Sequence, residues 1–205
     1  MRKNIGGILT ALAIAATIAS FYFDSKIIVL VSSLRTGFFD QFFLGITLLS
    51  SEIIIFFILT SLFLWNENKR KWILPLWLTL FFSVAASFLL KIAVHRQRPF
   101  QCGLVSLLPS LQESSFAVWN FSFPSFQAML AFSAIPILSK EFPKLKYAWI
   151  ILAVFVAFSR VYFGLHFLSD IIAGGLIGYV IGIIILKYEK ERKIGEKIYR
   201  KIFGE

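Results

Sequence analysis

Two short polar segments of this chain carry the residue types that cleavage of a phosphate ester requires. They cover residues 91–99 and 159–170, and each lies at the end of an apolar run. Charged side chains in such a place are costly in a membrane protein, so a functional role is the first interpretation. Together they supply cations that could hold an anion, and an imidazole beside a carboxylate that could attack it.

The second segment contains His166 and Asp170, which are four residues apart and share one face if the segment is helical. The carboxylate can then accept a hydrogen bond from one imidazole nitrogen and leave the other nitrogen as a nucleophile. Arg160 lies just upstream and can bind the anion under attack. A structural contact at a helix start is the alternative for the pair alone, but the accompanying cations favour catalysis.

The first segment contains Lys91 and Arg98, on either side of a turn that closes at Pro99. The compact charge of a lysine and the planar fork of an arginine together suit the oxygens of a phosphate. The same two residues would also serve as anchors whose charged ends reach the lipid headgroups. Further along, a predicted helix that starts near Pro124 and Ser125 offers free backbone N–H groups to a phosphate.

The composition places these residues in a membrane protein. Of the 205 residues, 58% are hydrophobic and 16% are charged, and the mean hydropathy is +0.80. A soluble domain has about 25% charged residues, so the surplus apolar surface must face lipid. Cys102 is the single cysteine, which excludes an intrachain disulfide and a cysteine metal cluster. The two histidines are too few for a histidine-rich metal site.

The hydropathy pattern predicts an all-α bundle of six membrane-spanning helices, in a single domain that covers residues 1–205. A spanning helix needs about 20 apolar residues. The six candidates are Ile5–Phe23, Phe42–Trp65, Trp72–Leu90, Phe123–Ser139, Tyr147–Tyr162 and Phe167–Leu186. The first resembles a signal peptide, but no small-residue cleavage site ends it, and we interpret it as a retained span. Pro75 and Pro136 fall within spans and predict kinks.

Two segments between the spans are longer than a connection requires. The apolar run Ile27–Leu34 predicts a short helix in the headgroup region, and Phe100–Phe121 predicts a cap beside the membrane. In the last span Gly174, Gly178 and Gly182 recur every four residues. This stripe permits close helix approach, either inside the bundle, which we favour, or in a dimer.

The positions of the lysines and arginines predict a multi-pass protein of the cell membrane with both termini in the cytoplasm. Most of the 21 cationic residues then lie inside, and the candidate site faces the outer or periplasmic side. The basic tail, residues 187–205, would rest against anionic inner-leaflet lipid. Membrane lipid, rather than nucleic acid, therefore accounts for the net charge of +10.

In their order and spacing, these motifs resemble those of the type 2 phosphatidic acid phosphatase superfamily. The matching residues are Lys91, Arg98, Pro99, Ser159, Arg160, His166 and Asp170. The resemblance covers about residues 25 to 186 and implies a six-helix bundle that requires no metal or other cofactor. It implies that His166 attacks phosphorus to form a phosphohistidine and that Asp170 orients it. The residues implied to bind the phosphoryl oxygens are Lys91, Arg98, Ser125 and Arg160.

The second motif departs from the family pattern. The family has Pro-Ser-Gly-His, whose histidine protonates the leaving group, whereas this chain has Gln127 at that position, where we expect it to bind the substrate. An amide cannot donate a proton at neutral pH, and loss of a general acid costs about 10²–10⁴ in rate. A lipid monophosphate, unlike a lipid alcohol, leaves as a stable anion without a proton. We therefore expect a preference for lipid diphosphates such as polyprenyl diphosphate.

Two further ionisable residues have open roles, and two alternative functions remain compatible with the motifs. His95 could replace the missing acid if its helix continues past Lys91, or it could be an interfacial histidine. Glu52, within the second predicted span, is expected to face the bundle interior in a structural role.

A lipid-linked phosphotransferase, or a catalytically impaired phospholipid-binding or transport protein, would carry the same motifs. The sequence does not define the lipid chain or the oligomeric state.

Overall fold

The structure is a computed structural model that describes residues 2–108, 111 and 120–203. Within those ranges the regular elements are all helices, joined by turns and loops, without β-strands. The helices are α1 (Arg2–Ser33), α2 (Gly37–Leu49), α3 (Glu52–Leu64), η1 (Glu67–Trp72), α4 (Ile73–Val94), α5 (Phe126–Ser133), α6 (Ile135–Glu141), η4 (Pro143–Leu145), α7 (Lys146–Tyr162), α8 (Leu168–Arg192) and α9 (Ile194–Phe203). The predicted all-α fold is confirmed.

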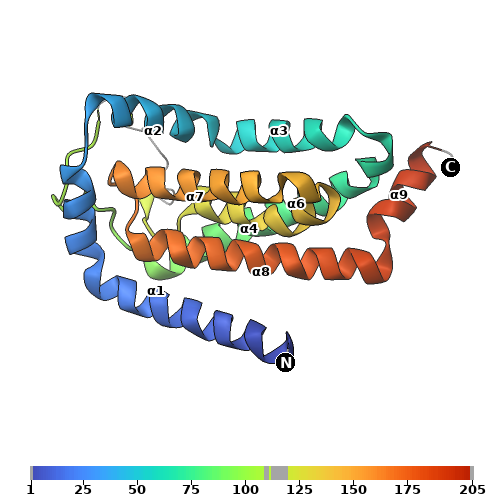
Figure 1. Ribbon diagram of the computed structural model, residues 1–205, viewed down its shortest axis with the longest axis horizontal. Helices are drawn as coiled ribbons and strands as arrows, with labels where there is room; N and C mark the ends of the chain where they lie inside the picture. Colours follow the sequence, from blue (N-terminus) through green and yellow to red (C-terminus); the bar gives the residue numbers. More distant parts are fainter. Residues whose placement is uncertain (1, 109–110, 112–119, 204–205) are drawn as a thin grey trace.

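The long helices run along one axis, as expected for a bundle that crosses a membrane (Figure 1). Glu67–Val94, Pro143–Tyr162 and Leu168–Arg192 are each long and apolar enough to span a bilayer. A fourth candidate is the pair formed by Ile18–Ser33 and Gly37–Leu49, which is bent by 118°. The chain is therefore a multi-pass membrane protein, while the predicted count of six spans is not confirmed.

The second predicted span is interrupted, because α2 ends at Leu49 and α3 begins at Glu52. The hydroxyl of Ser50 donates to the carbonyl of Thr47 at 2.9 Å, a local bond that competes with the helical ladder. Glu52 consequently lies in the first turn of α3, where a negative charge suits the helix dipole. It is exposed rather than buried in the bundle interior, but its carboxylate accepts a hydrogen bond from Gln127 of α5 at 3.1 Å, which agrees with the predicted structural role.

The two predicted proline kinks have different outcomes. The fourth span divides into α5 and α6 at Ala134, next to Pro136, which cannot donate a backbone hydrogen bond. Pro75 instead lies in the first turn of α4, where the missing N–H has no helical partner to lose. Only the break near Pro136 is therefore confirmed.

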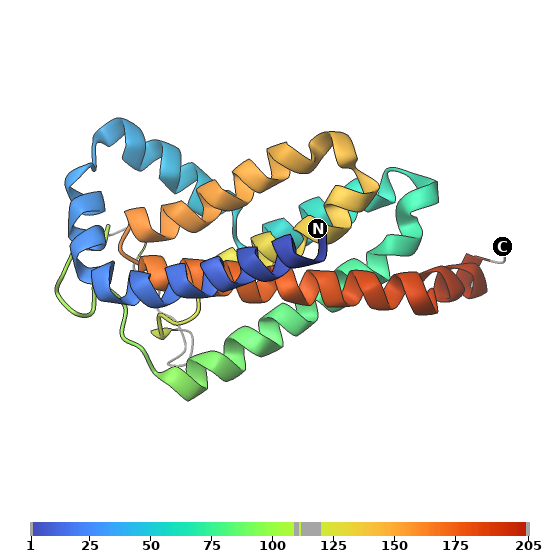
Figure 2. The same ribbon diagram turned by 60° about the horizontal axis from the view of Figure 1, so that its bottom comes forward.

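The predicted interfacial helix Ile27–Leu34 is not a separate element, because α1 continues unbroken to Ser33. Figure 1 shows that α1 turns and passes across one end of the bundle, and in Figure 2 its first part runs alongside α8. Asp24, the residue after the first predicted span, lies inside α1, where it is only 2% exposed and bonded within the protein.

The predicted cap, Phe100–Phe121, falls partly outside the described residues. Its described beginning packs against the turn between α7 and α8, where Phe100 N donates to the carbonyl of Gly164 at 3.3 Å. A Cβ on Gly164, whose φ is +71°, would lie 2.1 Å from the side chain of Val105, so the turn admits no larger residue.

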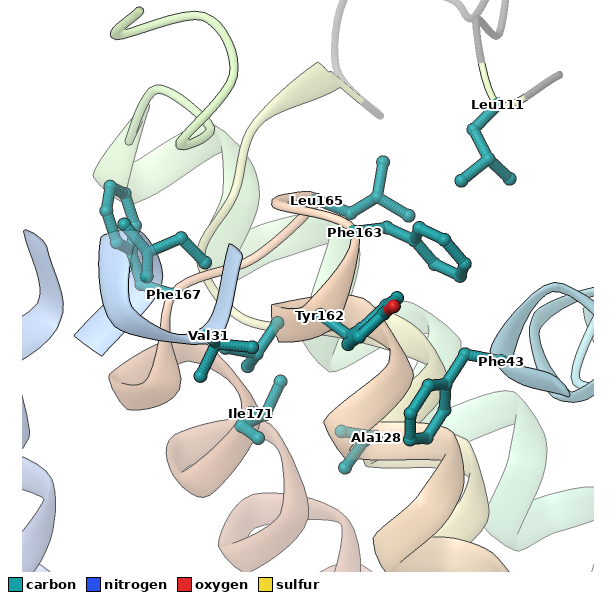
Figure 3. Packing of buried hydrophobic residues seen from close by; sticks show 12 residues of the cluster. Val31, Phe43, Leu111, Ala128, Tyr162, Phe163, Leu165, Phe167 and Ile171 are labelled. Carbon is teal, nitrogen blue, oxygen red and sulfur yellow. The ribbon is translucent and has the colours of Figure 1, made fainter. Parts of the chain in front are cut away.

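A buried apolar cluster supports the same end of the bundle. Figure 3 shows Phe43 of α2 directed toward Tyr162 of α7, with ring centroids 4.6 Å apart. Phe163, Leu165 and Phe167, which surround His166 in the sequence, are all buried in this cluster. The segment that carries His166 is thus held in place by the burial of its apolar neighbours.

The glycine stripe of α8 lies against α5, which is buried on most of its surface. A Cβ on Gly178 would lie 2.1 Å from the carbonyl oxygen of Met129, and one on Gly174 would lie 2.5 Å from that of Ser125. The interpretation that the stripe packs inside the bundle is confirmed. It brings the start of α5 directly against the start of α8.

Replacing Gly178 with alanine should force α5 and α8 apart and destabilise the protein by about 1–3 kcal/mol, the usual cost of overpacking. Thermal unfolding in detergent measures the loss. Gly45→Ala is the matched control, because nothing lies within 4 Å of a Cβ at that helical position. Equal melting temperatures for the two variants would contradict the packing described here.

Candidate active site

The carboxylate of Asp170 is fully buried and joins three separate segments of the chain. It accepts hydrogen bonds from Arg96 Nη1 at 2.7 Å, Ser122 Oγ at 2.5 Å and the backbone N–H of Phe167 at 2.8 Å. These donors follow α4, precede α5 and begin α8, respectively. Asp170 therefore fixes the relative positions of the three segments that carry the cations of residues 91–98, Ser125 and His166.

His166 is 1% exposed, and its main polar contact differs from the predicted one. Its Nδ1 lies 2.7 Å from the carbonyl oxygen of Ser122 and 3.9 Å from Asp170 Oδ2. The expected direct hydrogen bond to Asp170 is therefore replaced by one to a backbone carbonyl. With the proton on Nδ1, the lone pair is on Nε2. Asp170 orients the imidazole indirectly, because it holds Ser122 through the serine hydroxyl.

The three predicted cations are brought together with His166. Lys91, Arg98 and Arg160 are 1%, 8% and 4% exposed. Burial lowers the pKa of His166 well below its usual range, and the positive charges of Arg98, Lys91 and Arg160 lower it further. A neutral imidazole beside three cations is the state that attack on a phosphoryl group requires.

Backbone carbonyls just before α5 hold two of these cations. Lys91 Nζ donates to the carbonyl of Phe121 at 2.5 Å, and Arg98 Nε donates to that of Asn120 at 3.2 Å. Such bonds offset part of the cost of gathering like charges away from water. They also tie the first motif to the chain that leads into the second.

The chain leaves α4 at His95, which adopts a left-handed conformation with φ of 51°. The helix therefore does not carry His95 onto the face of Lys91, as the proton-donor hypothesis required. The imidazole is exposed and lies edge-on against Phe121, with ring centroids 4.5 Å apart. These contacts favour the interfacial alternative.

The second motif contributes Ser125 and Gln127, whose surroundings differ. Ser125 N donates to the carbonyl of Asp170 at 3.0 Å, and its buried hydroxyl has no hydrogen-bond partner among the described residues. A buried hydroxyl of this kind suits a ligand oxygen. Gln127 Nε2 instead donates to Glu52 Oε1 at 3.1 Å, which turns its amide toward α3.

Three residues of the site were missed from the sequence: Ser122, described above, Arg96 and Asp24. Arg96 forms ion pairs of 2.7 Å with both Asp170 and Asp24, and its guanidinium lies 4.1 Å from the ring centroid of Phe167. Asp24 also accepts the backbone N–H of Ser169 at 3.0 Å. An aspartate within an apolar stretch was the available signal, because such a residue needs a buried partner.

Comparison with known proteins identifies the family. Residues 72–194 match the PAP2 superfamily, and this range exceeds half of the chain. The chain belongs to the PAP2 superfamily. This result confirms the resemblance seen in the motifs, and the matched range contains the three cations, Ser125, His166 and Asp170.

Two solved structures are similar to this chain over most of their length. The transmembrane PAP2 type phosphatidylglycerolphosphate phosphatase from Bacillus subtilis has 25% identity and a TM-score of 0.70, with 95% of this chain and 99% of that chain covered. Aquifex aeolicus LpxE has 26% identity and a TM-score of 0.65, with 81% and 96% covered. No curated protein sequence matches the chain. The protein thus has the PAP2 membrane lipid phosphatase fold.

Replacing Arg96 with methionine should leave two buried carboxylates without their shared cation and destabilise the protein by about 3–5 kcal/mol. Adding Asp24→Asn should recover part of that loss, because one of the unpaired charges is then removed. Thermal unfolding of the single and double variants measures the coupling. Arg70→Met is the control, since Arg70 pairs with an exposed Glu67. Strictly additive losses would contradict the proposed network.

The lowered pKa of His166 makes a prediction for the pH dependence of the reaction. Protonation inactivates a nucleophilic imidazole, so the rate should persist below the usual histidine value of 6.5 and fall only at more acidic pH. Arg98→Gln removes a nearby positive charge and should raise the pKa of His166. The fall in rate on the acidic side of the pH–rate profile should then occur at higher pH. Single-turnover rates across pH test this, and an unmoved limb would contradict it.

Proposed function

We propose that the protein is a membrane lipid phosphatase that removes a phosphate from a lipid phosphate or diphosphate through a phosphohistidine at His166. The observation that supports this most strongly is the buried imidazole of His166 among three buried cations. Phosphoryl transfer needs mainly positioning and stabilisation of negative charge, and these side chains supply both. Membership of the PAP2 superfamily agrees with the same reaction.

In the first step, Nε2 of His166 attacks phosphorus, and the bond from phosphorus to the leaving oxygen breaks. Lys91, Arg98 and Arg160 hold the phosphoryl oxygens, and the free hydroxyl of Ser125 donates to one of them. The proton on Nδ1 stays against the carbonyl of Ser122 throughout. A water molecule then attacks the phosphohistidine, and the N–P bond breaks to release inorganic phosphate.

The cationic side chains take the charge-neutralising role that a metal ion fills in other phosphatases. We therefore propose that the reaction needs no metal. We also propose that the site faces the outer or periplasmic side, because the lysine-rich end of the bundle lies at the other end of α8. On this orientation both termini are cytoplasmic.

The chemistry of the leaving group favours lipid diphosphates as substrates, and polyprenyl diphosphate is the substrate that we propose. Gln127 occupies the position of the family's proton-donating histidine, and its amide is directed to Glu52. A monophosphate ester would have to expel an alkoxide without help, whereas a diphosphate expels a stable phosphate anion. A phosphotransferase would follow the same first step and use another acceptor in place of water.

The direct test is release of inorganic phosphate from polyprenyl diphosphate by the purified protein, assayed in detergent with a chelator present. His166→Ala should lower the rate by at least about 10³-fold, because the nucleophile is lost. His95→Ala is the matched control and should keep the wild-type rate. No release by the wild-type protein would favour the alternative of a phospholipid-binding or transport protein. Equal release by His166→Ala would indicate a contaminant.

Gln127→His should restore a general acid and raise activity on lipid monophosphates by about 10²-fold or more. Activity on the matching diphosphate should change far less, because its leaving group does not need the proton. The ratio of kcat/KM values for the two substrates measures the effect. An equal gain on both substrates would show that the leaving-group argument is wrong.

A further inference from the structure

The end of the bundle opposite the candidate active site contains a second cationic cavity, of about 340 Å³. It is formed by η1, α6, the end of α8 and α9, and the last part of α8 and α9 can be followed at one end of Figure 1. Five lysines line it: Lys69, Lys71, Lys140, Lys190 and Lys193. Helix α8 separates the two sites by about 37 Å, at 1.5 Å per residue over its length.

The glutamates in the wall of this cavity are already engaged. Glu189 is 7% exposed and accepts the backbone N–H of Gly195 with both carboxylate oxygens, at 3.1 and 3.0 Å. Glu141 pairs with Lys140 at 3.5 Å. Glu196 pairs with Arg200 at 2.8 Å. The lining holds five lysines and three glutamates, so the cavity keeps a net positive charge.

Two of the lysines also have partners. The ammonium group of Lys140 lies 3.5 Å from the ring centroid of Trp72, and that of Lys69 lies 3.8 Å from the ring centroid of Phe142. The side chains of Lys71, Lys190 and Lys193 form no hydrogen bond or ion pair with any described residue. Because more lysines than glutamates line the cavity, these three side chains give it a positive potential that attracts an anion.

The backbone around these lysines is closely packed. A Cβ on Gly195 would lie 2.4 Å from the carbonyl oxygen of Lys71 and 2.8 Å from Pro75 Cδ, so α9 contacts η1 and the start of α4 directly. The two bonds from Glu189 fasten the turn that carries Lys193. The backbone that carries Lys71, Lys190 and Lys193, in η1 and at the end of α8, is thus held around one space before any ligand arrives.

We infer that this cavity binds a phosphate group, either in the headgroup of an anionic phospholipid or as a free phosphate ion. Basic pockets between helices at a membrane surface favour such headgroups. Helix α9 supports a position at the lipid surface, because Ile194, Ile198 and Ile202 recur every four residues and share one face. The inference does not depend on the chemistry at His166.

The test compares two triple variants of the full chain that lose the same charge. The cavity variant carries Lys71→Gln, Lys190→Gln and Lys193→Gln. The control variant carries Lys144→Gln, Lys187→Gln and Lys197→Gln, which remove lysines of the same end that do not line the cavity. Binding to the candidate active site is common to both and cancels in the comparison. A single Lys190→Gln variant guards against a folding defect, because that side chain is exposed.

Phosphatidylglycerol binding to the detergent-solubilised proteins is titrated by native mass spectrometry, and inorganic phosphate is added as competitor. The cavity variant should bind the lipid at least about tenfold more weakly than the control, since each lysine near an anionic headgroup contributes measurably. Competition by inorganic phosphate would assign the site to the phosphate group itself, and its absence would assign it to the whole headgroup. Equal affinity of the two triple variants would overturn the inference.

Discussion

The buried carboxylate of Asp170 is the contact on which the rest of the site depends. Its donors come from chain segments that are 74, 48 and 3 residues away in the sequence. A buried carboxylate must be fully hydrogen-bonded, so these segments cannot separate without leaving a charge unpaired. The network extends through Arg96 to Asp24 on α1, and this helix therefore helps to build the site although it carries no recognised motif.

The close contact of α5 with α8 provides the scaffold for that network. Glycines on α8 let the helices approach until the start of α5 lies against the carbonyl of Asp170. Ser122, only three residues before Ser125, is then in reach of both His166 and Asp170. One serine thus positions the imidazole with its carbonyl and is itself held through its hydroxyl. The close packing of α5 against α8 therefore determines the orientation of the His166 imidazole.

The parts of this structure that the sequence predicts are those with a strong local signal. The starts of α4, α7 and α8 and the end of α7 lie within one residue of the predicted ones, whereas α4 and α8 continue past the charges at Lys91 and Lys187. The convergence of His166 with the cations follows from their spacing and from the family resemblance. The carbonyl of Ser122 could not be predicted, because a backbone acceptor has no signature in the sequence. The ion pair between Asp24 and Arg96, 72 residues apart, depends on how α1 packs.

We propose that His166 is the nucleophile, surrounded by the three buried cations. The most direct measurement mixes the protein with a lipid diphosphate labelled at its terminal phosphorus and stops the reaction rapidly without acid. Peptide mapping then locates the label. We predict a label on His166 that is stable to alkali and lost in acid, as expected for a phosphoramidate bond. A label on any other residue, or phosphate release with no labelled protein intermediate, would contradict the account.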